Sequence, residues 1–272
     1  MSDEHNPPMP PRIAVRPPPV GHERVRLLLA YDGSKFSGYA QNENVRTVAG
    51  ELRAALERVL RRQVFLAVAG RTDAGVHAWG QVVSFDAPIG IVDPPKMRRT
   101  LNSLLGPTIA TREVTIAPDD FHARFSAVGR TYHYKVLCAQ PPDPFLAKTS
   151  WHMRSPVDLP LMSAASNAIL GLHHFGSFCK IPRDRPGATM LRRVDVARWT
   201  ETPHPDGRVL DFEITASAFC HQMVRSLVGT LMEIGLAKMD PGELETALTR
   251  DDRSLAGPLA PPEGLTLWKV HY

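Results

Sequence analysis

Residues 69–78 read AGRTDAGVHA and separate two apolar runs, VFLAV at residues 64–68 and QVVSF at residues 81–85. Both runs are rich in β-branched and aromatic side chains, so we expect two strands with an exposed loop between them. Such a loop presents its polar side chains without burying them. Asp73, near its centre, is therefore the first candidate for a catalytic carboxylate.

Two glycines bracket this acid. Gly70 and Gly75 permit backbone angles that a side chain would forbid, and they allow another backbone to approach closely. Arg71 and Thr72 add hydrogen-bond donors beside the carboxylate. An aspartate before a small residue and a glycine is also common turn chemistry, in which the carboxylate bonds to its own backbone. The stretch is, however, much longer than a turn requires.

Composition limits the class of protein. The chain has 272 residues, 43% of them hydrophobic, which is enough for one large domain or two smaller ones with a sizeable core. The formal net charge of +4 is compatible with a polyanionic partner without requiring one. No run of about 18 apolar residues is present and no secretory signal core begins the chain. We therefore expect a soluble cytoplasmic protein with no membrane partner.

The three cysteines are odd in number and widely separated. Because they show no Cys-x-x-Cys spacing, we interpret Cys138, Cys179 and Cys220 as reduced thiols. The histidine pair before Cys179, or Cys220 with His221, could be pictured as metal ligands. Neither has the second pair that a four-coordinate site needs, so the sequence predicts no metal site.

Prolines and apolar periodicity divide the chain. Residues 1–22 carry seven prolines and are predicted to form a disordered tail, to which we assign no function. An N-terminal α+β half at residues 23–120 carries Asp73, and a C-terminal α+β half follows at residues 121–272. In each half we expect an antiparallel sheet with helices on one face.

The expected elements follow from hydrophobic period and capping residues. In the first half they are strands at 25–31, 64–68, 81–85 and 109–116, a helix after an N-cap at Thr47, and a helix at 97–105. In the second half they are strands at 131–137, 194–199, 209–215 and 265–271, with helices at 159–170 and 220–234.

Residues 70–78, followed by Gly80-Gln81-Val82, resemble the active-site motif of the tRNA pseudouridine synthase A family. Five further blocks resemble the same family in the same order: YDGSKFSG at 31–38, FHARFSA at 121–127, RTYHY at 130–134, MVRSLVG at 223–229 and APPEGLTL at 260–267. Ordered agreement of this kind is highly specific. The chain departs from the family pattern at Tyr39, Thr108 and His174, which we expect to affect peripheral RNA contacts more than the chemistry.

The resemblance implies two pseudo-symmetric halves whose sheets join into one long sheet, with an active-site cleft between them. It implies an isomerase that converts uridine to pseudouridine in the anticodon arm of tRNA, at positions 38, 39 and 40, and acts as a homodimer. The reaction cuts the bond from N1 to the ribose, turns the base and rejoins it through C5. It needs an ionised carboxylate in a site that excludes water, and no cofactor.

Asp73 is the catalytic candidate, either as a nucleophile or as a base toward the ribose. A carboxylate beneath an extruded base tends to become neutral unless a cation lies beside it. Arg225 fits that role, because it lies opposite the apolar stripe of the expected helix, about 160° from Leu227. Without the resemblance, a solvated surface arginine is the favoured alternative; with it, we expect an ion pair between Arg225 and Asp73.

Three further side chains are candidates for substrate binding. The ring of Tyr132 could stack on the extruded uracil, whereas Tyr134 on the same strand face is assigned to the core. Leu265, just after Gly264, is expected to form an apolar wall. Arg71 either fills the space that the extruded base leaves or clamps a phosphate, and the residues favour neither role over the other.

Two other functions are weighed. A non-catalytic RNA-binding module on the same fold needs a basic face and aromatic side chains, but no pairing of Asp73 with Arg225. A carboxylate-dependent hydrolase of a small substrate needs a second catalytic acid or a metal cluster, and the sequence shows neither. Both functions are therefore disfavoured.

Overall fold

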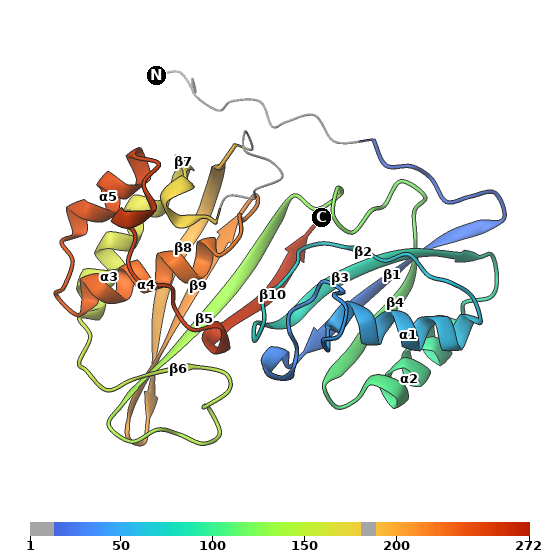
Figure 1. The fold of residues 1–272 in the computed structure, drawn as a ribbon, viewed down its shortest axis with the longest axis horizontal. Coiled ribbons are helices and arrows are strands. Elements are labelled where there is room, and N and C mark those ends of the chain that lie inside the picture. The colour runs from blue at the N-terminus through green and yellow to red at the C-terminus, as the bar shows by residue number, and fades with distance from the viewer. Residues whose placement is uncertain (1–13, 181–188) are drawn as a thin grey trace.

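The computed structural model describes residues 14–180 and 189–272. Its strands form one continuous sheet in the order β4-β1-β3-β10-β5-β9-β8-β7, with β2 paired to β3 and β6 paired to β5 (Figure 1). The strands are β1 (His22–Tyr31), β2 (Ala67–Val68), β3 (His77–Pro88), β4 (Ile109–Ala117), β5 (Gly129–Ala139), β6 (Trp151–Met153), β7 (Gly171–His174), β8 (Leu191–His204), β9 (Gly207–Ala216) and β10 (Leu265–His271). The α-helices are α1 (Val48–Leu60), α2 (Pro94–Leu105), α3 (Leu159–Ser166), α4 (Met223–Gly235) and α5 (Pro241–Thr249).

The sheet has two parts that meet where β10 lies beside β3. Strand β1 is antiparallel to both of its neighbours, β4 and β3, and β9 is antiparallel to both of its neighbours, β5 and β8. The last strand, β10, is antiparallel to β5 but parallel to β3, with Thr266 opposite His77 and Leu267 opposite Ala78. The predicted α+β class with one long sheet is confirmed. That the joint is parallel was not anticipated, and the pseudo-symmetry of the halves stays a prediction.

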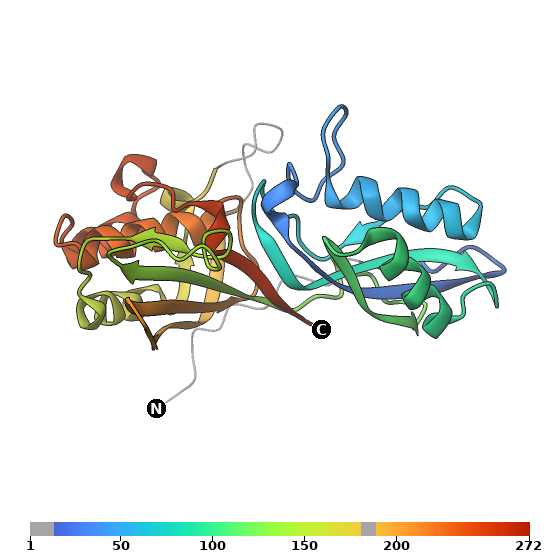
Figure 2. The same cartoon turned by 90° about the horizontal axis from the view of Figure 1, so that it is seen from below.

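Helices cover one face of this sheet: Figure 2 shows α1 and α4 on the same side of it, and α2 packs against α1. The predicted N-cap of α1 is present, since the Thr47 side chain accepts a hydrogen bond from the Gly50 N–H. Apolar residues at helical spacing then face the sheet, among them Leu52, Leu56 and Leu60. The sheet and these helices therefore enclose the core of the first part.

Three predicted elements are shorter than expected. The run at 64–68 pairs only over Ala67–Val68, and the helix expected at 159–170 ends at Ser166. The helix expected at 220–234 begins instead at Met223, because Gln222 has a φ of 69°, in the left-handed region that cannot continue a right-handed helix. Residues 221–222 therefore form a turn immediately before α4, in which the Met223 N–H donates to the Cys220 carbonyl oxygen.

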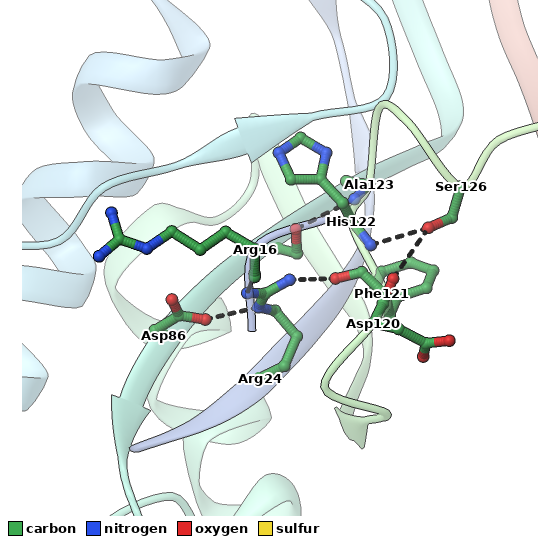
Figure 3. A network of polar contacts seen from close by, with 9 residues as sticks. Arg16, Arg24, Asp86, Asp120, Phe121, His122, Ala123 and Ser126 are labelled. Carbon is green, nitrogen blue, oxygen red and sulfur yellow. Dashed lines mark hydrogen bonds and ion pairs between the residues drawn. The ribbon is translucent and has the colours of Figure 1, made fainter. Parts of the chain in front are cut away.

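The segment between β4 and β5 is tied to the first part by a polar network (Figure 3). Arg24 on β1 is buried and pairs with Asp86 on β3, and it also donates to the carbonyl oxygen of Phe121. A third donation, at 3.1 Å, goes to the carbonyl oxygen of Arg16, which lies in the part of the proposed tail that the structure describes. Residues 1–13 of that tail lie outside the described residues.

The expectation of three reduced thiols is wrong for one pair. Cys179 and Cys220 form a disulfide with a Cα–Cα distance of 5.7 Å. Their separation of 41 residues in sequence does not keep them apart, because the turn after β7 packs against the start of α4. Cys138 is free and half-buried.

None of the helices in residues 14–180 and 189–272 has the length and apolar character needed to cross a bilayer. Within the same ranges, no cluster of three or more histidine, cysteine, aspartate or glutamate side chains is arranged to hold a metal ion.

Candidate active site

The loop that carries Asp73 rests on a buried polar network. The Tyr31 hydroxyl lies 2.8 Å from the Thr72 hydroxyl and accepts a hydrogen bond from the Gln81 amide at 3.2 Å. The same amide donates to the carbonyl oxygen of Gly70 at 2.7 Å. Burial raises the pKa of Tyr31 to about 12, so its hydroxyl stays protonated at neutral pH. Neutral hydrogen bonds thus fix the loop on both sides of Arg71.

A second segment, residues 36–39, supports the loop from another side. The Tyr39 N–H donates to the Thr72 carbonyl oxygen at 3.0 Å. Gly38 has a φ of 99°, and a Cβ at this position would lie 3.0 Å from the same oxygen. Tyr39 is buried, so this departure from the family pattern lies in the support of the loop and not in a peripheral RNA contact as expected.

The Asp73 carboxylate meets an arginine and a histidine side chain of the second part. Arg225 Nη1 lies 3.3 Å from Oδ2, and His221 Nε2 lies 3.3 Å from Oδ1. The predicted ion pair between Asp73 and Arg225 is therefore present. The exposed fraction is 27% for the Asp73 side chain, 12% for Arg225 and 47% for His221. Arg225 approaches from the protein side and His221 from the side nearer to solvent.

Arg225 is held by the chain segment before β10. Its Nε donates to the Ala260 carbonyl oxygen at 2.7 Å, and the Ala260 N–H donates to the Arg225 carbonyl oxygen at 3.1 Å. Gly229, one turn further along α4, admits this segment, because a Cβ there would lie 1.7 Å from the Pro258 carbonyl oxygen. The close approach beside Gly229 is thus made by the backbone of this chain itself.

Tyr132 lies on β5 close to the loop. A Cβ added at Gly70 would lie 3.9 Å from its hydroxyl oxygen, and its ring meets the Phe219 ring edge-on, with centroids 5.0 Å apart. Burial raises the pKa of Tyr132, which keeps the hydroxyl protonated. Tyr134, on the same strand face, is fully buried and donates to the Pro261 carbonyl oxygen, so its assignment to the core is confirmed.

Leu265 and Arg71 stand in contrasting surroundings. Leu265 is the first residue of β10, is 6% exposed and pairs with Tyr134 in the sheet register. Arg71 is exposed on the loop, and within residues 14–180 and 189–272 its guanidinium has no hydrogen-bond or ion-pair partner. Leu265 therefore adds an apolar surface to the interior of the junction, while Arg71 leaves its charge available to an external partner.

Comparison with known proteins identifies the family to which the chain belongs. The sequence model described as tRNA pseudouridine synthase matches residues 28–126 and 165–272, which include Asp73, His221 and Arg225. The chain belongs to the tRNA pseudouridine synthase family.

Relatives of this family named tRNA pseudouridine synthase A are similar to the chain over most of its length. One from Geobacillus kaustophilus (strain HTA426) is 41% identical over 254 residues, covering 92% of this chain and 95% of the relative. Another, from Bacillus subtilis (strain 168), is 39% identical over 251 residues, covering 92% of this chain and 99% of the relative. The family resemblance read from the sequence motifs is thus confirmed.

Two solved structures are also similar to 76% of this chain. They are described as the archaeal box H/ACA sRNP Nop10-Cbf5 complex and a Cbf5-Nop10-Gar1 complex. The TM-scores are 0.31 and 0.32, the identities 15% and 13%, and the matches cover 44% and 54% of those chains.

For this member of the tRNA pseudouridine synthase family, sequence reasoning missed the contact of His221 with Asp73. His221 entered that reasoning only as a rejected metal ligand. A signal was present, since His221 precedes Arg225 by four residues and side chains at that spacing share one face of a helix. Although α4 begins two residues after His221, the two side chains still reach the same carboxylate.

Proposed function

We propose that this chain isomerises uridine to pseudouridine in the anticodon arm of tRNA, at positions 38, 39 and 40, with Asp73 as the catalytic carboxylate. The observation that carries the proposal is the ion pair between Asp73 and Arg225, in a member of the tRNA pseudouridine synthase family. Asp73 belongs to the proposed N-terminal half, residues 23–120, and Arg225 to the C-terminal half, residues 121–272. The tRNA is proposed to enter a cleft between these halves.

Arg225 and Asp73 have different roles in the proposed reaction. Arg225 keeps the carboxylate charged once substrate excludes water, so that Asp73 can attack the nucleoside or take a proton from the ribose. The bond from N1 to C1′ breaks and the bond from C5 to C1′ forms, while C5 loses a proton and N1 gains one. Because nothing is oxidised, reduced or hydrolysed overall, the reaction needs no cofactor.

Tyr132 and Leu265 are proposed to contact the extruded uracil. An aromatic ring and an apolar side chain suit the two faces of a base, and both residues lie in the strands that meet beside the Asp73 loop. Arg71 is proposed to occupy the space that the base leaves or to hold a phosphate. Its exposed guanidinium, unpaired within the described residues, supports either role.

A homodimer is proposed as the acting form. His133 and Tyr134 are successive residues of β5 and point to opposite faces of the sheet. On the face opposite to Tyr134, His133 contacts Trp268, which stacks on Trp79 with ring centroids 5.9 Å apart. These tryptophans are 43% and 46% exposed, so this face offers apolar area that a second copy can cover. The tRNA partner supports a cytoplasmic location.

Tritium release from a tRNA transcript labelled at uracil C5 tests the proposal. Isomerisation frees the C5 proton, so the wild-type protein should release tritium, while Asp73→Asn should lower the release by at least about 1,000-fold. Filter binding of the same transcript provides the control, because the Asn side chain keeps nearly the same shape. Binding without release by the wild-type protein would favour the RNA-binding module, and the absence of both would refute tRNA as the substrate.

A further inference from the structure

The two oxygens of the Asp73 carboxylate have separate partners. Arg225 holds Oδ2, is only 12% exposed and is fixed in turn by the Ala260 carbonyl oxygen. His221 lies 3.3 Å from Oδ1 and is 47% exposed. Because the more exposed partner lies beside Oδ1, this is the oxygen on the side from which a substrate can approach.

The backbone around His221 is fixed from both directions. Cys220 is joined to Cys179, and the Lys180 N–H donates to the His221 carbonyl oxygen at 3.0 Å. The next residue, Gln222, has a φ of 69°, a left-handed conformation that residues with long side chains seldom adopt. Such conformations persist only where the surrounding structure imposes them, and they concentrate at functional sites. The turn thereby brings the imidazole to Asp73.

We propose that His221 is a positioning residue for the reaction of Asp73. With a proton on Nε2, the imidazole holds Oδ1 while Arg225 holds Oδ2, so two donors fix the plane of the carboxylate. With Arg225 alone, the carboxylate can rotate about its Cβ–Cγ bond, which is a soft torsion. A misplacement of a reacting group by about 1 Å can cost about 100-fold in rate. The inference rests on the proposed catalytic role of Asp73.

A role in folding alone is less well supported by the surroundings of His221. Its side chain is about half exposed, so it contributes little to the core, and its ion pair with Asp73 is solvent-accessible. His174 offers a matched control in the same half. Its Nδ1 lies 2.8 Å from Asp251 Oδ1, and its side chain is 42% exposed, but it has no part in the proposed site.

The experiment measures single-turnover tritium release with saturating protein, together with the KM for tRNA and the melting temperature. His221→Leu removes the donor and should lower the single-turnover rate about 10-fold with little change in KM. His221→Gln places an amide N–H near the position of Nε2 and should restore most of the rate. His174→Leu should retain the wild-type rate. His221→Ser replaces His221→Leu if the leucine variant does not fold.

The outcomes separate this inference from the proposed function. A wild-type rate in His221→Leu, with Asp73→Asn inactive, would refute the positioning role and leave the catalytic role of Asp73 intact. Equal losses in His221→Leu and His221→Gln, with a raised KM or a lowered melting temperature, would also refute it, because such losses indicate RNA contact or folding. No release by the wild-type protein would refute the proposed function and the inference together.

Discussion

The loop that carries Asp73 rests on neutral hydrogen bonds that are buried, whereas the start of α4 reaches the same carboxylate with charged or titratable side chains. Under the loop, the Tyr31 hydroxyl, the Thr72 hydroxyl and the Gln81 amide satisfy one another. At α4, Arg225 and His221 meet one carboxylate oxygen each. The first arrangement sets where the acid stands, and the second places one polar partner beside each of its oxygens.

Because of this difference, we expect mutations in the two regions to affect different properties, stability in one region and reaction rate in the other. A buried neutral network contributes to the free energy of unfolding, because each unsatisfied group costs desolvation energy. A partly exposed charge at a reacting group contributes little to folding but much to the transition state. Variants under the loop should therefore lower stability first, and variants at α4 should lower the rate first.

Among the variants that compare these two regions, the largest effect is expected at Arg225. Arg225→Met keeps an unbranched side chain as far as about the position of Nε, but it removes the charge beside Oδ2 and the donation to the Ala260 carbonyl oxygen. We expect the single-turnover rate on a tRNA transcript to fall about 100-fold. Arg225→Lys restores the charge without the planar fork and should recover only part of the rate.

Filter binding and thermal melting of both Arg225 variants serve as controls. If Arg225→Met melts far below the wild-type protein while its remaining folded fraction reacts at the wild-type rate, the division between the two regions is wrong. A loss of tRNA binding that matches the loss of rate would instead reassign Arg225 to substrate binding.

An intermediate effect is expected at Tyr31, which tests the buried network under the Asp73 loop. Tyr31→Phe leaves the Thr72 hydroxyl and the Gln81 amide without this partner, so we expect the free energy of unfolding to fall by about 1–2 kcal/mol. Tyr39→Phe is a matched control, because the Tyr39 hydroxyl is equally buried but has no partner among the described residues. Its removal should be nearly neutral. Urea unfolding measures both, and equal losses in the two variants would contradict the network.

The local features of the site were predictable from the sequence because neighbouring residues determine them. The Asp73 loop stands out by its glycines and flanking apolar runs, and helical periodicity places Arg225 on the side of α4 that faces the loop. Thr47 caps α1 as predicted, because an N-cap is a contact over three residues. Strand β2 is shorter than the predicted strand at 64–68, because its length depends on pairing with β3 rather than on its own composition.

The remaining features depend on contacts between distant segments. Asp73 and Arg225 are 152 residues apart in sequence, and the family resemblance, rather than spacing, suggested their pairing. The Cys179–Cys220 disulfide and the turn at Gln222 have no local signature, because glutamine is not a residue typical of left-handed backbone. In contrast, α5 was missed although Asp240 and Pro241 give a readable N-terminal signal.

The smallest effect is expected from acid, at the segment between β4 and β5 that packs against the first part of the sheet. His122 lies between β4 and β5, and its Nδ1 accepts the N–H groups of Arg124 and Phe125 at 3.1 and 3.3 Å. Only an unprotonated Nδ1 can accept these bonds. Burial lowers the pKa of His122, and the charges of Arg24 and Arg124 act in the same direction.

The sign of the pH effect follows from this lowered pKa. The unfolded chain binds the His122 proton near pH 6.5 and the folded chain binds it at lower pH. The stability that neutral His122 contributes is therefore present above about pH 6.5 and is lost as the pH falls through the lowered folded pKa. Urea unfolding at about pH 7.5 and about pH 5.5 measures the fall in the free energy of unfolding between the two conditions. This fall should be smaller in His122→Asn than in the wild-type protein, because the amide oxygen accepts the same bonds without titrating. Equal losses in the two proteins would show that the loss of stability in acid does not come from His122.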